Sequence, residues 1–218
     1  MKPAQFIVSQ KSESSIEPIP EDLHYGVLVR LYDVGSQYSE TFDKLSRKLV
    51  LQFELPDLPH IEAEIDGKKV SLPRLISYTV TKSLHEKAKL KPLLETWRGR
   101  RFTTEELNGF DIANIVGKPG NVQVLHTHKD GKTYANISNV LPYPKGMPQT
   151  KPTTETLMFS VDQLDSPEEL ETLKLPEWIQ NLVKTSREWE RLTAPKAAPK
   201  QAPAPVETAT DDGGDVPF

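Results

Sequence analysis

Several stretches of the first 150 residues alternate between apolar and polar positions with a period of two. This is the pattern of half-buried β-strands, and it predicts strands over residues 23–32, 46–55 and 75–81. In the second stretch Phe53 and three leucines share one face, while Lys48 and Gln52 lie on the other. The third stretch is rich in β-branched and aromatic residues, which also favours a strand.

Two Asp-Gly pairs predict hairpin turns, because a two-residue type I′ turn needs φ > 0 at both central positions. These pairs are Asp66-Gly67 and Asp130-Gly131. Pairing outward from the second turn sets Lys129 against Lys132, Thr127 against Tyr134 and Val124 against Ile137. One face could line a core and carries Val122, Val124, His126, Ala135, Ile137 and Leu141. The other face is polar and basic, with Thr127, Lys129, Lys132, Tyr134 and Asn136.

Short helices are expected between the strands. A Ser or Thr followed three residues later by Glu forms a capping box, which occurs at Ser83–Glu86 and at Thr103–Glu106. Gly117 is expected to end this helical region before the last hairpin. About six strands joined by hairpin turns favour an antiparallel barrel or sandwich over a parallel sheet. Strands, then a helix, then a closing hairpin is the order of an oligonucleotide/oligosaccharide-binding (OB) fold.

The C-terminal third has a different character. Residues 146–152 have the composition of a linker, and Ser166 followed by Pro167 and two glutamates predicts a helix start. A second helix is expected from Pro176, with one stripe formed by Trp178, Ile179, Leu182, Val183, Ser186 and Trp189. We favour a stripe that docks this helix on the barrel, and the alternative is a dimer contact or a partner-binding helix.

We therefore expect a mainly β protein with an OB-fold-like antiparallel barrel, inserted short helices, a C-terminal helical extension and a disordered acidic tail. The expected parts are a flexible N-terminal segment at 1–20, the barrel at 21–150, the linker and C-terminal helices at 151–192, and a disordered Pro/Ala-rich tail at 193–218.

Composition excludes several protein classes. The 218 residues include no cysteine, which rules out disulfides, a thiolate zinc site and a cysteine nucleophile. No apolar run reaches the ~20 residues needed to cross a bilayer, and the N-terminus lacks the apolar centre of a signal peptide. We expect a soluble protein in the cytoplasm, which would be the host cytoplasm if a phage encodes it.

The net charge of −4 is unevenly distributed. Residues 20–150 hold 18 Lys and Arg against 16 Asp and Glu, whereas residues 151–192 hold 5 against 9. Within residues 82–101 there are seven cations and two glutamates. Because local charge decides where a polyanion binds, the central region remains a candidate for nucleic-acid binding.

Cations beside aromatic rings are what a surface for single-stranded nucleic acid requires, since cations contact phosphates and rings stack on bases. The hairpin at 129–134 has this combination, and the strand ending at Tyr32, the loop 33–41 and the cluster next to Trp97 repeat it. The expected DNA-binding residues are Arg30, Tyr32, Tyr38, Lys48, Arg98, Arg100, Arg101, Lys129, Lys132 and Tyr134.

The last eight residues, DDGGDVPF, combine acidic side chains with a terminal Phe and its α-carboxylate. An apolar pocket with a basic rim could bind the ring and the carboxylate together. This ending resembles the acidic C-terminal tip of bacterial single-stranded DNA-binding proteins. In that family the tip recruits replication and repair proteins and competes with DNA for the barrel. The matching residues are Asp211, Asp212, Asp215, Val216, Pro217 and Phe218, while Gly213 and Gly214 dilute the acidic run.

A second resemblance lies in the middle of the chain. The segments WRGRRFTTEEL, GFDIANIVGKP, HKDGKTYANI and LPYPKGM, between Trp97 and Met147, are similar to a phage-encoded family of single-stranded DNA-binding proteins. They cover about a quarter of the chain, and residues 32–55 resemble the same family. The resemblance implies an OB barrel and a role in replication or recombination of a phage genome. The helices at 166–192 have no counterpart in the bacterial family, so its tetrameric assembly is not carried over.

Catalytic patterns are missing from the sequence, and we expect neither an enzyme nor a cofactor. His126 and His128 alternate on one strand face, but no H-E-x-x-H or cysteine cluster accompanies them. Glu62, Glu64 and Asp66 lie beside a turn, which explains them as solvated residues rather than as a magnesium site.

These observations predict a sequence-independent single-stranded DNA-binding protein of phage replication or recombination, whose tip recruits replication proteins. One alternative is a non-enzymatic adaptor or inhibitor that binds a host replication protein through its tail. Another is a strand-annealing recombination protein. The sequence leaves homo-oligomerisation open.

Overall fold

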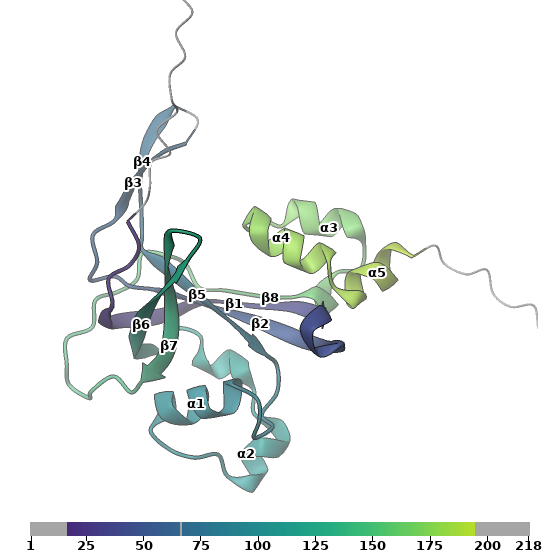
Figure 1. The fold of residues 1–218 in the computed structure, drawn as a ribbon, viewed down its shortest axis with the longest axis horizontal. Helices are drawn as coiled ribbons and strands as arrows, with labels where there is room; N and C mark the ends of the chain where they lie inside the picture. Colours follow the sequence, from purple (N-terminus) through teal and green to yellow (C-terminus); the bar gives the residue numbers. More distant parts are fainter. Residues whose placement is uncertain (1–16, 66, 195–218) are drawn as a thin grey trace, which may run out of the picture.

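A six-stranded sheet forms the centre of the molecule (Figure 1). The computed structural model describes residues 17–65 and 67–194. The strands are hydrogen bonded in the order β5-β2-β1-β6-β7, and β8 pairs with β1. Neighbouring strands are antiparallel except for β1 and β8, which are parallel. The bounds are β1 (Asp22–Ser39), β2 (Lys44–Glu54), β5 (Leu75–Thr81), β6 (Pro119–Lys129), β7 (Lys132–Leu141) and β8 (Leu157–Ser160).

A separate two-stranded ribbon, β3 (Ile61–Ile65) and β4 (Lys68–Leu72), extends away from this sheet (Figure 1). It is the hairpin predicted at Asp66-Gly67, and Gly67 has the expected positive φ of 74°. The predicted hairpin is confirmed by this pairing, while Asp66 itself lies outside the described residues.

Strand β1 is longer than the sequence predicted. Its 18 residues pair with β2 along one edge, while the other edge pairs first with β6 and then with β8. The prediction of a loop that begins at Asp33 is wrong, because the strand continues to Ser39. Gly35 has a φ of 79° at a register shift between Asp33 and Ser36, so the chain bends there without ending the strand.

The main core lies on the inner face of the sheet. Leu28 and Leu31 of β1 pack with the leucines and Phe53 of β2. The alternation in β2 is confirmed, but the alternation predicted for β1 would put Leu28 and Leu31 on opposite faces, and the register shift between Leu28 and Arg30 brings both into this core. Helix α1 (Leu90–Arg98) covers the bottom of this core, and its Trp97 ring lies 5.3 Å from the ring of Phe53.

Helix α1 begins later than predicted. The Ser83–Glu86 capping box does not form, and the Ser83 Oγ instead accepts a hydrogen bond from the N–H of His85 at 3.2 Å. A helix that began at Ser83 would contain Pro92 in its interior, whereas a start at Leu90 places Pro92 in the first turn, where a missing N–H costs little. The second box is confirmed, with Thr103 capping α2 (Thr104–Gly109), and the 3-10 helix η2 (Ile112–Ile115) follows.

The sheet does not close into a barrel. Strands β5 and β7 are its two outermost strands, and within the described ranges no ladder joins them. The sequence therefore predicted correctly that the fold is mainly β and largely antiparallel with short helices. The closed barrel is not present.

A second core holds the C-terminal helices against the outer face of β1 and β8. It contains Tyr32, Val34 and Val50 from the sheet and Leu170, Ile179 and Val183 from the helices. The predicted stripe thus docks its helices on the sheet, which was the favoured interpretation, except for Trp178, which is 41 % exposed. The helices are α3 (Pro167–Thr172), α4 (Glu177–Lys184) and α5 (Arg187–Thr193), which follow the 3-10 helix η3 (Val161–Gln163).

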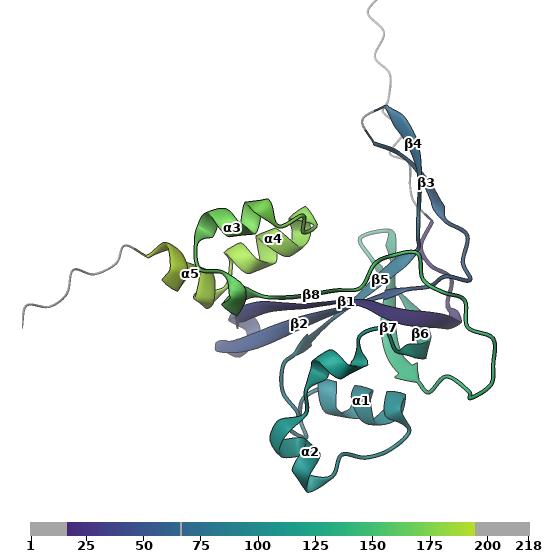
Figure 2. The same cartoon turned by 180° about the vertical axis from the view of Figure 1, so that it is seen from behind.

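Two details of this region differ from the prediction. The single helix expected from Pro176 is broken at Thr185, because the Ser186 Oγ accepts a hydrogen bond from the N–H of Trp189 and caps α5. Strand β8 was also not predicted. It has only four residues and lies shortly after the segment that was expected to be a linker. The connection from β7 to β8 crosses the back of the sheet (Figure 2), where the buried Glu54 carboxylate accepts hydrogen bonds from the N–H groups of Thr153 (2.7 Å) and Thr154 (2.8 Å).

The start of α5 is attached to β1 where Gly35 bends it. The Glu188 carboxylate accepts hydrogen bonds from the N–H of Ser36 at 2.6 Å and from its hydroxyl at 2.8 Å. A Cβ on Gly35 would lie 2.6 Å from the Glu188 Oε2 and 2.7 Å from the Ser186 Cβ. This position therefore needs glycine for its φ and for the close approach of the helix.

None of the helices in the described part of the chain has the length and apolar character needed to cross a membrane.

The Gly35→Ala variant is expected to be less stable than a matched Gly117→Ala variant by about 1–3 kcal/mol. Gly35 and Gly117 have nearly the same φ, 79° and 77°, but a Cβ on Gly117 would have nothing within 4 Å. The comparison separates the cost of the backbone conformation from the cost of crowding α5. Urea denaturation of both variants measures the difference, and equal losses would show that crowding by α5 is unimportant.

Candidate nucleic-acid interface

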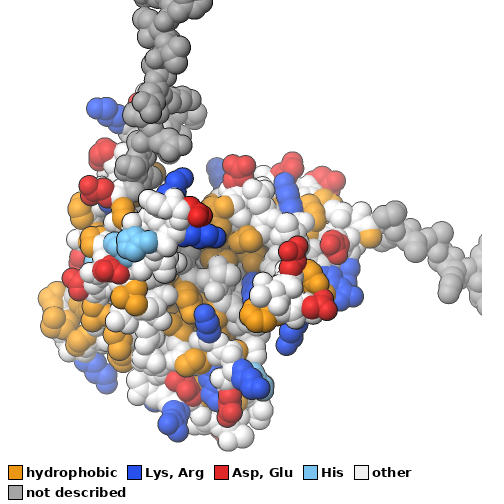
Figure 3. All heavy atoms as spheres, viewed as in Figure 1, with side chains coloured by type: hydrophobic (Ala, Val, Ile, Leu, Met, Phe, Trp, Pro, Cys, Tyr) orange, Lys and Arg blue, Asp and Glu red, His pale blue; other side chains and the backbone are white. Residues whose placement is uncertain are grey.

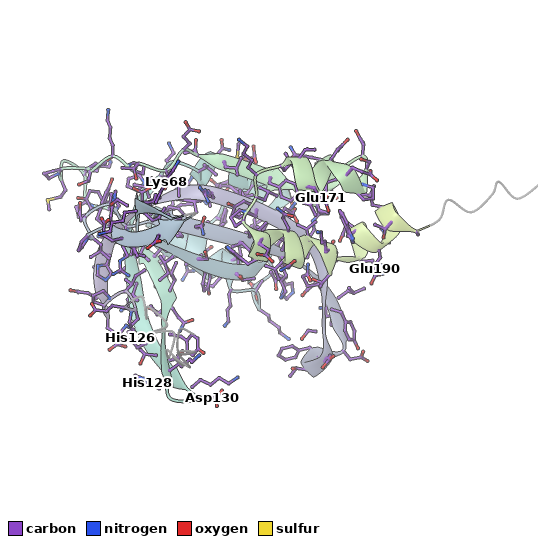
Figure 4. All side chains as sticks on the ribbon, turned by 90° about the horizontal axis from the view of Figure 1, so that it is seen from above. Lys68, His126, His128, Asp130, Glu171 and Glu190 are labelled. Carbon is purple, nitrogen blue, oxygen red and sulfur yellow. The ribbon has the colours of Figure 1, made fainter. Side chains whose placement is uncertain are left out.

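Two loops project from the same side of the sheet (Figure 4). One is the β6–β7 turn, whose tip is Asp130, and the other joins β1 to β2 through the 3-10 helix η1 (Glu40–Phe42). The outer faces of β2 and β5 lie in the part of the sheet next to η1. We call this surface, from the β6–β7 turn to η1, the loop-flanked face.

The β6–β7 hairpin has the predicted pairing close to its turn. Asp130 and Gly131 both have positive φ, at 52° and 71°, and Lys129 pairs with Lys132. Tyr134 pairs with Thr127, and its side chain is 48 % exposed. The end of this hairpin therefore presents two cations and one ring to solvent.

Farther from the turn, the predicted pairing is wrong by one residue. A register shift between Gln123 and Val124 sets Val122 opposite Val140. Val140 is consequently buried in the main core, while the expected core residue Leu141 is half-buried.

The floor of the loop-flanked face near η1 is polar and internally hydrogen bonded. The Lys48 Nζ donates to the Thr81 Oγ1 at 2.9 Å, and the Gln52 amide donates to the Ser77 hydroxyl at 3.1 Å. Arg30 is half-buried and donates from Nη1 to the Gln52 Oε1 at 3.4 Å. Both predicted cations, Lys48 and Arg30, thus lie on the outer face of the sheet.

An open groove of about 610 Å³ lies between η1 and the segment that follows β5. Phe42 at its edge has a side chain that is 79 % exposed, the largest exposure among the large hydrophobic residues described. No Asp or Glu is among its described lining residues, which are Ser39, Phe42, Lys44, Ser46, Lys48, Thr81, Ser83, His85, Lys87 and Ala88. We call this the η1 groove. Hydroxyls and cations without a competing carboxylate can bind phosphate oxygens.

Of the groove residues, only Lys48 was predicted from the sequence to bind DNA. Phe42, Lys44 and Lys87 were missed, although the run YSETFDK already combines two rings with a lysine. Tyr38 was chosen and is 58 % exposed on the same projecting loop. Its hydroxyl donates to the Asp43 Oδ1 at 2.5 Å, and this hydrogen bond raises the pKa of Tyr38.

Tyr32 does not belong to any exposed surface. Its side chain is fully buried in the second core beneath the C-terminal helices, so the prediction that it contacts DNA is wrong. The alternation placed it on the outer face correctly, but the sequence could not show that helices cover that part of the face.

The arginine cluster after Trp97 is not free to bind DNA as the sequence predicted. The Glu106 carboxylate forms ion pairs with both Arg98 and Arg100, the latter at 2.6 Å. The pKa of Glu106 is lowered to about 2, mainly by the hydrogen bond from Arg100 and to a smaller extent by the one from the Thr103 N–H. Arg98 also stacks over the rings of Phe102 at 4.4 Å and Phe110 at 5.1 Å, and only 15 % of its side chain is exposed. Arg98 is therefore a packing residue.

The arginine cluster is also far from the β6–β7 turn. Trp97 donates from Nε1 to the carbonyl of Pro119, at the start of β6. Ten residue steps of about 3.3 Å separate Pro119 from Lys129, which amounts to about 33 Å along the strand. The structure thus brings Tyr38 and Lys48 together near η1 and Lys129, Lys132 and Tyr134 together at the hairpin, but places Arg98, Arg100 and Arg101 elsewhere.

Two more cations near the face are neutralised by Asp33. Its buried carboxylate accepts from Arg47 at 2.9 Å and from Lys82 at 2.7 Å, and Arg47 also pairs with Asp162. Burial acts to raise the pKa of Asp33, but the hydrogen bonds from Arg47 and Lys82 outweigh it and lower the pKa. The basic character of the loop-flanked face therefore comes from the remaining lysines.

Figure 3 shows Lys and Arg side chains on the hairpin, on the helical lobe and around α1 and α2, interspersed with Asp and Glu. Within residues 17–65 and 67–194, no three His, Cys, Asp or Glu side chains gather where they could hold a metal ion. The His126 Nε2 lies 2.7 Å from the carbonyl of Ile19, and the His128 Nδ1 lies 3.1 Å from the Thr133 hydroxyl. The predicted partner-binding tail, from Asp211 to Phe218, lies outside the described residues.

Arg98→Ala is expected to reduce the free energy of unfolding by about 1–3 kcal/mol, because it leaves Glu106 short of a partner and exposes two aromatic rings. The exposed Arg101 is the control, and Arg101→Ala is expected to change stability by no more than about 0.5 kcal/mol. Urea denaturation of both variants distinguishes the roles. Equal stability of the two variants would contradict a packing role for Arg98.

No family model matches this chain, and a comparison with curated proteins found no match.

Proposed function

We propose that this protein binds single-stranded DNA on the loop-flanked face without reading sequence. The observation that carries the proposal is the combination of exposed rings and lysines on two loops that project to the same side of the sheet. Tyr38 and Phe42 lie on one loop and Tyr134 on the other, with Lys44, Lys129 and Lys132 beside them. Rings can stack on any base, and lysines can contact any phosphate.

The order of the strands supports the same proposal. The path β5-β2-β1-β6-β7, with α1 between β5 and β6 in the chain, is the order of an OB fold that has an inserted ribbon and an open seam. In that fold, oligonucleotides bind on the second and third strands and on the loops that follow the first and fourth strands. Here these correspond to β2, β5, the η1 loop and the β6–β7 turn. We therefore propose an OB-like fold, with a phage replication or recombination protein as its context.

Titration with fluorescent oligo-dT is expected to show tight binding that weakens steeply with salt, because each lysine–phosphate contact releases counterions. A duplex of equal length is expected to bind weakly. Tyr134→Ala is expected to weaken binding by about 1–3 kcal/mol, while Tyr134→Phe retains the ring and most of the affinity. Lys132→Ala should reduce the salt dependence, and Arg101→Ala, whose residue lies away from the face, should not.

Several outcomes would count against this function. Equal affinity for duplex and single strand would point to nonspecific electrostatics. No binding of oligo-dT would leave the face without its proposed ligand and favour the adaptor that acts through its tail. Unchanged binding by both Tyr134→Ala and Lys132→Ala would place the DNA on another surface. An assay of complementary-strand annealing separates a protective role from a recombination role.

Deletion of residues 211–218 is expected to leave oligo-dT affinity unchanged or to raise it, because it removes acidic residues that compete with DNA for the lysines. The same deletion should abolish recruitment of replication proteins, measured by pull-down with the full chain as the control. A loss of DNA affinity on deletion would contradict a competing role for the tail.

A further inference from the structure

The two ring-bearing loops are separate sites rather than parts of one patch. They lie toward opposite ends of β1, since Asp22 at its start pairs with Val124 of β6 and Ser39 at its end pairs with Lys44 of β2. Beyond Val124, strand β6 continues to Lys129 before the hairpin turns. β1 has 18 residues, so a straight strand of this length would measure about 60 Å. The bend in β1 shortens this distance, and both loops still project to the same side (Figure 4).

Each loop carries its own ring and its own cations. Phe42 stands at the edge of the η1 groove with Lys44, Lys48 and Lys87 among the lining residues. Tyr134 stands on the hairpin with Lys129 and Lys132. Exposure of 79 % for Phe42 is unfavourable for an apolar ring in water, and none of the three apolar clusters in the described residues includes it. A stacked base would remove much of that ring from water.

The sheet near the groove offers fewer free groups than the loops do. Gln52 is only 6 % exposed and is hydrogen bonded to Ser77 and Arg30, so its amide is already satisfied. Val50 lies in the second core and is fully buried. Because the C-terminal helices cover Val50, the sheet between the two loops offers DNA little open surface and few free polar groups.

We propose that single-stranded DNA is held at two separate anchors, with one base stacked on Phe42 and its phosphates in the η1 groove, and another base stacked on Tyr134. This inference rests on the proposed function and specifies how the face is used. A short oligonucleotide occupies one anchor at a time. A longer one bridges both, and its second contact is intramolecular, so affinity rises sharply once the bridging length is reached.

The experiment is an oligo-dT length series, from about 4 to about 16 nucleotides, titrated against the full chain and three variants. For the unchanged chain we expect a step in affinity of at least about tenfold at one length, beyond the gradual rise that comes from added phosphates. Phe42→Ala should remove the step and weaken binding of the longest oligonucleotide at least about fivefold. Phe42→Trp should keep the step, because it retains a ring.

Leu45→Ala is the matched control. Leu45 is also an exposed apolar residue of this region, at 39 %, but it does not line the η1 groove. It should leave the length series unchanged. Because Phe42 is so exposed, its replacement should leave the thermal unfolding temperature unchanged, which excludes unfolding as the cause of weaker binding.

The outcomes separate the two proposals. If the unchanged chain binds no oligonucleotide of any length, the proposed function fails. If it binds and Phe42→Ala gives the same length series as the unchanged chain, the function stands and the two-anchor inference is wrong. A smooth rise of affinity with length, without a step, also contradicts two anchors.

Discussion

The structure depends on one strand whose hydrogen-bonding capacity is shared among three others. Strand β1 pairs with β2 on one edge and with β6 and then β8 on the other, so its polar backbone groups find partners over most of its length. Its two faces serve different cores, with Leu28 and Leu31 inside the sheet and Tyr32 and Val34 beneath the helices. A change of partner at the middle of β1 would separate the two cores, and both projecting loops depend on where this strand starts and ends.

The bend at Gly35 makes this arrangement possible. It allows β1 to continue past Asp33 while the start of α5 approaches the backbone, and Glu188 then binds the N–H of Ser36. Nearby, Asp33 binds Arg47 and Lys82, so the same short region joins β1, β2, the end of β5 and, through Asp162, the 3-10 helix η3. The buried carboxylate of Asp33 and the half-buried carboxylate of Glu188, with their charged and N–H partners, thus fix the position of the C-terminal helices relative to the sheet.

Local patterns predicted local structure well. The alternation around Phe53, the Asp130-Gly131 turn and the Thr103 capping box each depend on neighbours a few residues away, and each prediction is confirmed. The failures depend on tertiary packing, which a local pattern does not specify. Tyr32 is buried by helices more than a hundred residues later, and Arg98 is held by Phe102, Phe110 and Glu106 after the chain folds back on itself. Part of the candidate site was predictable for the same reason, since Lys129, Lys132 and Tyr134 belong to one hairpin. The η1 groove was not, because strand and loop segments some forty residues apart line it.

The absence of carboxylates among the described lining residues of the η1 groove has a consequence for the unliganded protein. Lys44, Lys48 and Lys87 line the same open groove, and repulsion among their like charges opposes the folded state. Dissolved salt screens that repulsion, and the same salt weakens contacts between lysines and a bound polyanion. Higher ionic strength should therefore raise the folding stability of the free protein and lower the affinity of its complex with a polyanion. A polyanion in the groove would relieve the repulsion directly, so ligand and salt substitute for each other in stabilising this end of the sheet.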